Sequence, residues 1–510
     1  MKKINNVKKF KILFIIWIII FSFGLVRKTF QNDTFYTIKI GELILKNGID
    51  MLDHFSFHTN LAYTYPHWLY DVFIYTIYNL FGYFGLYFSS IILLIILLLI
   101  IYKTNLLTCE KNHLMAALSV IIGALAISGF ATARAQLASF IIFAIQIYFI
   151  ESFLKNGKKK YLFGLLFLSL ILCNIHVAVW PFYFVIYLPY LVEYLISIIT
   201  NKIKKDNKFT NFLKKHIIFE RNENIKYLFI TMLLSILTGL ITPLHDTPYT
   251  YLIKTMMGNS QKYIKEHQMI SWINSPFTII ITGETFFLAF LSKIKLRDLF
   301  MISGLSLMSI LSVRHIALLA LIGTICFGRT FSLFFENFNL DLNIKVFPFF
   351  LKKKTIIVSF ILVIIFSSLM FNYQFKKPYI DPEEYPTKAV EYLKENIDID
   401  KMRLYNDYNF GSYLILNDIP VFIDSRADLY TKEFSGLDYD IFLDYEFIAN
   451  DYQQKFEFYN ITHALIYKNN NPLYNIIRHD NNYKNLYEDD YFILYEKLGT
   501  PNYFVNYNYN

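Results

Sequence analysis

Long apolar segments recur along almost the whole chain, and they limit it to one class of protein. Most of these segments are close to the roughly 20 residues that an α-helix needs to cross a bilayer. They are Phe10–Val26, Phe84–Tyr102, Met115–Ala131, Ala135–Phe153, Tyr161–Ile175, Val177–Ile199, Tyr227–Thr242, Phe277–Leu291, Leu299–Val313, Ile316–Phe335 and Thr355–Phe371. Only 17% of the 510 residues are charged, against about a quarter in soluble proteins. The chain is therefore predicted to be an α-helical multi-pass membrane protein.

Basic residues predict which side of the membrane each loop faces. Lysines precede the first apolar segment, and further clusters lie near residues 103–111, 155–160, 202–226, 293–297 and 352–354. Because cytoplasmic loops are enriched in Lys and Arg, the N-terminus and these loops are predicted to be cytoplasmic. This gives about 11 spans, and the C-terminal tail then lies outside. His67–Gly82 is short for a span, and the count rises to about 12 or 13 if this segment also crosses. The net charge of +9 follows from these loops and indicates no nucleic-acid partner.

The residues after the last span differ in character and predict a second domain. The boundaries are 1–373 for the membrane domain, whose first outer loop is 27–66, and 374–510 for the tail. An amphipathic helix is expected in "DPEEYPTKAVEYLKENI", with a further helix in "PLYNIIRH". Short strands are expected in "MRLYND", "VFIDS", "HALIYK" and "YFILYE". The alternation predicts a small α/β domain outside the membrane.

The polar segment after the first span holds the first candidate catalytic residues. Phe35, Ile38, Leu43 and Ile44 share one face of an expected amphipathic surface helix that Gly48 can end. Asp33 and Asp53 flank this helix at the outer membrane surface. A carboxylate at that level is placed to deprotonate an incoming hydroxyl. The alternative is structural, since Asp33 suits an N-cap and Asp53 the start of a second turn.

Four basic or imidazole side chains are predicted at the outer ends of spans. They are Arg134 in "ATARAQLAS", His176 in "CNIHVAVW", and Arg314 and His315 in "LSVRHIALL". Arginine is uncommon on the outer side, so two of them there indicate an anionic partner such as a phosphate. The alternative is that each arginine pairs with an acid or reaches the head groups. A third charged group, Asp424, Arg426 and Asp428 in "FIDSRADLY", is interpreted as a salt-bridged turn, with glycan binding as the alternative.

Several motifs together resemble the GT-C superfamily of integral membrane glycosyltransferases. They are "NDTFYTIKIGELILKNGIDMLDHFSFHT", "PHWLYD", "ARAQLAS", "NIH", "SWINSP" and "NFGSYLILNDIPVFIDSRADLY", and together they extend over nearly the whole chain. The chain is most similar to the bacterial branch grouped with protein-mannosyltransferase-like and lipid A sugar-transferase-like enzymes. The resemblance implies a GT-C-type bundle in the bacterial cytoplasmic membrane, with an extracytoplasmic α/β domain at the C-terminus.

The same resemblance implies a reaction and roles for the candidate residues. A hexose or pentose would pass from a polyprenyl phosphate to a glycan, lipid or protein acceptor on the outer face. Asp33 would be the first candidate base and Asp53 the second, while Arg134, Arg314, His315 and His176 would hold the donor phosphate. Many relatives carry paired acids where this chain has Asn32 and Asp33. No cofactor or metal ligand is predicted, although a divalent metal stays open.

Three other interpretations are compatible with the sequence. A flippase or transporter would place polar residues along the middles of several spans, whereas the predicted spans are mostly apolar apart from Glu284. A non-catalytic envelope-assembly protein would keep the fold without the reaction. A glycan polymerase or ligase would use diphosphate-linked donors instead. The sugar and the acceptor are not predicted.

Overall fold

The computed structural model describes residues 2–110, 112–202, 215–258, 260–264, 276–337, 349 and 352–499. The motif "SWINSP" lies almost entirely outside these residues. Contacts between Cα atoms divide the chain into two compact units. The helical unit comprises Met1–Lys28, Phe84–Pro248 and Ile264–Lys376, and the loop–tail unit comprises Thr29–Tyr83, Tyr249–Tyr263 and Lys377–Asn510. The tail thus forms one unit with the first outer loop, and the predicted boundary at 373/374 falls close to the end of the helical unit.

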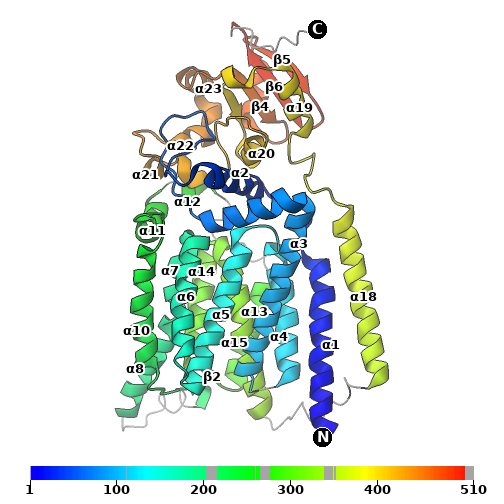
Figure 1. Cartoon of the computed structure of the whole chain (residues 1–510), viewed down its shortest axis with the longest axis vertical. Coiled ribbons are helices and arrows are strands. Elements are labelled where there is room, and N and C mark those ends of the chain that lie inside the picture. Colours follow the sequence, from blue (N-terminus) through cyan, green and yellow to red (C-terminus); the bar gives the residue numbers. More distant parts are fainter. Residues whose placement is uncertain are drawn as a thin grey trace. The chain divides into compact units, whose positions relative to one another are not determined.

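Helices, most of them long, make up the helical unit (Figure 1). They are α1 (Lys2–Leu25), the second part of α3 (Trp68–Thr108), α4 (His113–Ile127), α5 (Ala135–Asn156), α6 (Lys160–Ile175), α7 (Trp180–Val185), α8 (Leu188–Lys202), α10 (Ile225–Ile236), α13 (Pro276–Leu291), α14 (Leu296–Leu311), α15 (Ile316–Asn337) and α18 (Lys353–Lys376). Two-residue strands β1 (Ile217–Ile218) and β2 (Ile294–Lys295) pair in parallel. Caps fix several ends, and α5 stops where Gly157 adopts the left-handed conformation.

Six of the described helices are long and apolar enough to cross a membrane. They are Trp68–Thr108, His113–Phe130, Ala135–Asn156, Val177–Thr200, Val313–Asn337 and Lys353–Lys376, and three shorter apolar helices accompany them. The most apolar part of Val313–Asn337 is 89% buried by the helices around it, among them α4, α13 and α14. The corresponding part of α18 is only 6% buried, and α18 packs on α1. Such an exposed apolar helix is stable in lipid but not in water. The chain is therefore a multi-pass membrane protein, while the count of about 11 spans stays a prediction.

The segment His67–Gly82, whose crossing was uncertain, is separated from the next helix by a break. Gly82 has φ +60° and ψ −154° inside α3, so two helices meet there rather than one running through. A residue with a side chain is strained at positive φ, and glycine is not. The helix from Trp68 to Phe81 belongs to the loop–tail unit, and the residues from Phe84 onward belong to the helical unit.

In the loop–tail unit, the predicted amphipathic helix is α2 (Asn32–Asn47), and it ends at Gly48 with φ +84° as expected. Phe35, Ile38 and Ile40 on its buried face are at most 1% exposed. The helix packs against α20 (Gly411–Leu416) of the tail. The prediction of this helix from its hydrophobic spacing is confirmed.

Four strands of the tail form a sheet in the order β3-β4-β6-β5 (Figure 1). They are β3 (Leu404–Asn406), β4 (His463–Tyr467), β5 (Tyr483–Glu488) and β6 (Phe492–Lys497), and only the β3–β4 pair is parallel. Besides α2, α20 and the first part of α3, the described residues of this unit form the α-helices α11 (Thr247–Met257), α12 (Ser260–Tyr263), α19 (Thr387–Asn396), α21 (Lys432–Ser435), α22 (Ile441–Glu446), α23 (Ile448–Phe458) and α24 (Pro472–Ile477). Strands in "MRLYND", "HALIYK" and "YFILYE" and both predicted helices are confirmed.

One predicted strand of the tail is wrong. "VFIDS" forms no strand, and its backbone instead pairs with the first outer loop. The Phe57 N–H donates to the Val421 carbonyl at 3.2 Å, and the Val421 N–H donates to the Phe55 carbonyl at 3.2 Å. The buried apolar run is therefore real, but its hydrogen-bond partner lies more than three hundred and sixty positions earlier in the chain.

A close approach in the loop–tail unit makes Gly41 of α2 sensitive to substitution. A Cβ atom at Gly41 would lie 2.1 Å from the Asp71 carbonyl oxygen and 2.7 Å from the Tyr75 Cβ. Because a backbone atom cannot move aside cheaply, we expect Gly41→Ala to destabilise this unit by about 3 kcal/mol or more. Gly304→Ala in α14 is the matched control, since nothing lies within 4 Å of its Cβ position. Thermal unfolding in detergent measures both variants, and equal midpoints would contradict this packing.

Candidate functional site

Asp33 lies in the first turn of α2 and is half-buried. The N-cap of α2 is Gln31, so the expectation that Asp33 itself caps the helix is wrong. The side chain before it is anchored, because the Asn32 amide donates to the Tyr408 carbonyl at 2.9 Å. An acid in the first turn is favoured by the helix dipole. Asp33 is thus held at the start of a rigid helix, and its carboxylate does not act as the N-cap.

Asp53 occupies a different environment, with a side chain that is 0% exposed. One carboxylate oxygen accepts from the Ser56 N–H at 2.9 Å and the Ser56 hydroxyl at 2.6 Å, so Asp53 caps a turn as expected. The other lies 2.6 Å from the Arg426 guanidinium. Burial raises the pKa of Asp53, but the Arg426 charge and the Ser56 bonds outweigh it and leave that pKa below its ordinary value. This is the geometry of a structural ion pair.

Arg426 joins the first outer loop to the tail inside the loop–tail unit. It pairs with Asp424 at 2.7 Å as well as with Asp53, and its side chain is 3% exposed. The Tyr430 hydroxyl donates to the same Asp424 carboxylate, and the Arg426 guanidinium lies 5.0 Å from the Tyr63 ring centre. The interpretation of "FIDSRADLY" as a salt-bridged turn is confirmed for Asp424 and Arg426, whereas Asp428 accepts a hydrogen bond from the Tyr251 hydroxyl at 2.7 Å. The partner of Arg426 in the first loop could not be predicted from local spacing.

A second buried group in the same unit was missed in the sequence. His67 contacts the Asp71 carboxylate through Nδ1 at 2.6 Å and the Tyr36 hydroxyl through Nε2 at 3.0 Å. His67 and Asp71 stand four residues apart in "PHWLYD", a spacing at which side chains meet at the start of a helix. That spacing was the available signal. The group joins α2 to the helix that begins at Trp68.

The four residues predicted to hold a phosphate lie in turns at helix ends of the helical unit. His176 follows α6 and shares a 2.9 Å hydrogen bond with Ser139, in the second turn of α5. Arg134 is the residue immediately before α5, so it lies at the same end of the α5–α6 pair. Arg314 and His315 form the turn between α14 and α15, and the His315 ring lies 5.1 Å from the Phe182 ring in α7. Because α7 begins four residues after His176, the three turns lie at the same end of this unit.

A buried ion-pair network lies in the helical unit and was not predicted. Only Arg297 of this network was singled out in the sequence, as part of a basic cytoplasmic loop. Arg297 contacts Glu151 at 3.3 Å and Glu193 at 2.8 Å and also pairs with Glu220. Arg329 lies 2.5 Å from the same Glu151 and 3.2 Å from Asp298. Except for Glu220, these side chains are at most 9% exposed. Glu151, Glu193 and Arg329 are charged residues within predicted spans, and that was the missed signal. Glu284, the acid singled out instead, is exposed on α13.

A metal-dependent reaction would need clustered ligands. Within the described ranges, no group of three or more His, Cys, Asp or Glu side chains is arranged to hold a metal ion. The acids nearest the first loop are instead engaged with Arg426, His67 or lysines.

Comparisons with known proteins support the fold. No protein-family model and no curated protein matches the sequence. Among solved structures, the oligosaccharyltransferase of the archaeon Archaeoglobus fulgidus, tethered to an acceptor peptide with an NVT sequon, is similar with a TM-score of 0.55. The match has 10% identity and covers 89% of this chain and 68% of that one. At this identity the likeness concerns the fold and not the activity. The chain therefore shares its overall fold with this membrane oligosaccharyltransferase, while the GT-C superfamily and its branches stay predictions from the motifs.

Proposed function

We propose that the chain is a membrane glycosyltransferase that moves a sugar from a polyprenyl phosphate to an acceptor of the cell envelope. The observation that supports the proposal is that three turns with basic or imidazole side chains lie at the same end of the helical unit. Arg134, His176, Arg314 and His315 supply donors for a phosphate there. Nucleotide sugars stay in the cytoplasm, so an outward-facing transferase needs a lipid-linked donor. The acceptor is a glycan, lipid or protein.

The reaction assigns one task to the residues beside the acceptor hydroxyl and another to the residues beside the donor phosphate. The acceptor oxygen attacks the anomeric carbon, and the bond from that carbon to the phosphate oxygen breaks. The polyprenyl phosphate leaves with the electron pair of that bond, and Arg134 and Arg314 stabilise its added negative charge. Asp33 takes the proton of the acceptor hydroxyl as general base. Asp53 is not given this task, because its carboxylate is buried against Arg426.

Lipid analysis of a deletion strain tests the proposal in the cell. A strain without this chain should accumulate a polyprenyl-phosphate-linked sugar that the parent consumes. Restoring the wild-type chain should return the pool to the level of the parent strain. Unchanged lipid pools in the deletion strain, under conditions in which the chain is expressed, would contradict the proposal.

An outward-facing reaction requires the tail to lie outside the cytoplasm. Cysteine replaces the exposed Asn481 of the tail in one variant and the exposed Lys158 of the loop between α5 and α6 in the other. The three native cysteines are buried, so they give little background. We expect a membrane-impermeant maleimide to label Asn481→Cys in intact cells. Lys158→Cys should react only after lysis, and the reverse pattern would invert the predicted topology.

A further inference from the structure

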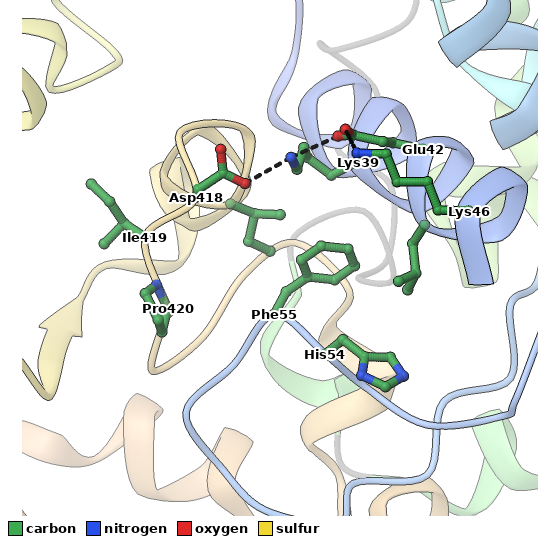
Figure 2. Close-up of a pocket in the computed structure, with 10 residues that line it drawn as sticks. Lys39, Glu42, Lys46, His54, Phe55, Asp418, Ile419 and Pro420 are labelled. Carbon is green, nitrogen blue, oxygen red and sulfur yellow. Dashed lines mark hydrogen bonds and ion pairs between the residues drawn. The ribbon is translucent and has the colours of Figure 1, made fainter. Parts of the chain in front are cut away.

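A small pocket in the loop–tail unit lies apart from the residues that carry the proposed reaction. Its volume is about 250 Å³, and it lies between α2, the start of the loop after it, and the end of α20 (Figure 2). Its polar lining comprises Lys39, Glu42, Lys46, His54 and Asp418. The remainder of the lining is apolar, and Figure 2 shows the Phe55 ring between Asp418 and His54.

The charges around this pocket balance one another. Lys39 lies 2.7 Å from both Glu42 and Asp418, and Lys46 lies 2.6 Å from Glu42. The lining therefore holds two ammonium groups and two carboxylates, with His54 paired to Asp50 behind it. The side chains of Asp418 and Lys46 are 77% and 66% exposed, so each can form a further hydrogen bond to a ligand. The pocket offers donors and acceptors together without a net charge.

The backbone holds Asp418 at the rim in a conformation that usually favours glycine. Asp418 follows the end of α20 with φ +60°. Its N–H donates to the Ile415 carbonyl at 3.0 Å, and the next N–H donates to the Leu414 carbonyl at 3.1 Å, as in common helix ends. Glycine or asparagine would suit this position with less strain. The chain instead has a carboxylate here, and that carboxylate contacts Lys39.

We propose that this pocket binds one neutral sugar ring of the acceptor. A sugar ring presents hydroxyls that both donate and accept, and a C–H face that packs on apolar and aromatic surface. Because two ammonium groups and two carboxylates line the pocket together, neither an anion nor a cation gains a net electrostatic attraction there. Pockets for drug-sized ligands begin near 300 Å³, so about 250 Å³ suits a single ring. The assignment rests on the proposed function, because it names the acceptor of that reaction as a glycan or glycolipid.

Saturation-transfer NMR on the purified full-length protein tests this assignment. The probes are the methyl glycosides of glucose, galactose, mannose and N-acetylglucosamine, in a detergent without a sugar head group. At least one glycoside should bind the wild-type protein. Asp418→Asn should weaken it about tenfold, since a charged hydrogen-bond acceptor is lost. Asparagine also tolerates positive φ, so the turn should survive. Asp438→Asn, at an exposed acid outside the pocket, should bind like the wild type.

Three results would overturn the assignment. They are the absence of binding by all four glycosides, equal binding by Asp418→Asn and the wild type, and displacement of the sugar by glycerophosphoethanolamine at lower concentration. The last result would assign the pocket to a lipid head group. Because binding is measured without turnover, it is separate from the test of the proposed function. If the protein bound a glycoside but transferred no sugar, the assignment of the pocket would stand and the proposed transferase function would be rejected.

Discussion

Asp33→Asn is expected to abolish sugar transfer while leaving the protein folded. An amide cannot take the acceptor proton at neutral pH, and loss of a general base typically lowers a rate by a factor of about 10²–10⁴. The structural cost should be small, because Asp33 is not the N-cap and interactions with the helix dipole contribute only about 0.3–1 kcal/mol. Transfer is followed as disappearance of the lipid-linked sugar in cells that express each variant at equal level.

Asp440→Asn is the matched control for this change. Asp440 caps α22, with its side chain accepting from the Leu443 N–H at 3.0 Å, and asparagine caps a helix about equally well. The same chemical substitution at a helix start should therefore leave transfer unchanged. Full activity in a normally expressed Asp33→Asn protein would remove the base assignment. It would then favour the interpretation of the chain as a non-catalytic assembly protein.

Arg297→Gln is expected to have the largest effect on stability. Arg297 contacts Glu151, Glu193 and Glu220, and the first two carboxylates are at most 9% exposed. Removing the guanidinium leaves buried acids without their main partner, and breaking a buried ion pair typically costs about 3–5 kcal/mol. The variant should lose its folded, monodisperse form in detergent at a much lower temperature than the wild type.

Arg221→Gln provides the comparison, because Arg221 pairs with Glu223 on the surface at side-chain exposures of 50% and 52%. Exposed pairs contribute about 0–1 kcal/mol, so its melting temperature should barely change. Arg297→Lys should fall between the two variants, since it keeps the charge but not the fork of donors. If Arg297→Gln and Arg221→Gln had the same melting temperature, the network would not stabilise the helical unit.

Local patterns in the sequence predicted the individual elements well. The apolar blocks predicted membrane-length helices, because a helix in lipid must satisfy its own backbone and be apolar outside. The spacing of Phe35 and Ile38 predicted α2, and Gly48 predicted its end. Of the tail strands, β5 was missed, because its side chains are mostly polar and are half-buried or exposed, so that its sequence resembles a surface loop.

Contacts between distant segments could not be predicted in this way. Asp53 and Arg426 are 373 positions apart, and neither position carries a local signal of the other. The same applies to "VFIDS", which looks like a sheet strand but pairs with the first outer loop. The alternative of Asp33 as a cap was wrong for a smaller reason, since α2 begins two residues earlier than such a cap requires and has Gln31 as its N-cap. Helix ends depend on such shifts of one or two residues.

Transferase activity is tested most directly by measuring whether the purified protein cleaves the sugar from its lipid carrier. The substrate is a lipid extract of the deletion strain grown on radiolabelled glucose, mixed with an unlabelled envelope extract as acceptor. We predict that the wild-type chain moves the label from the polyprenyl phosphate to the acceptor fraction, and that Asp33→Asn does not. A flippase would leave the bond between sugar and phosphate intact. Label that stays on the lipid with the wild-type chain, or leaves it equally with both proteins, would contradict a transferase that uses Asp33 as its base.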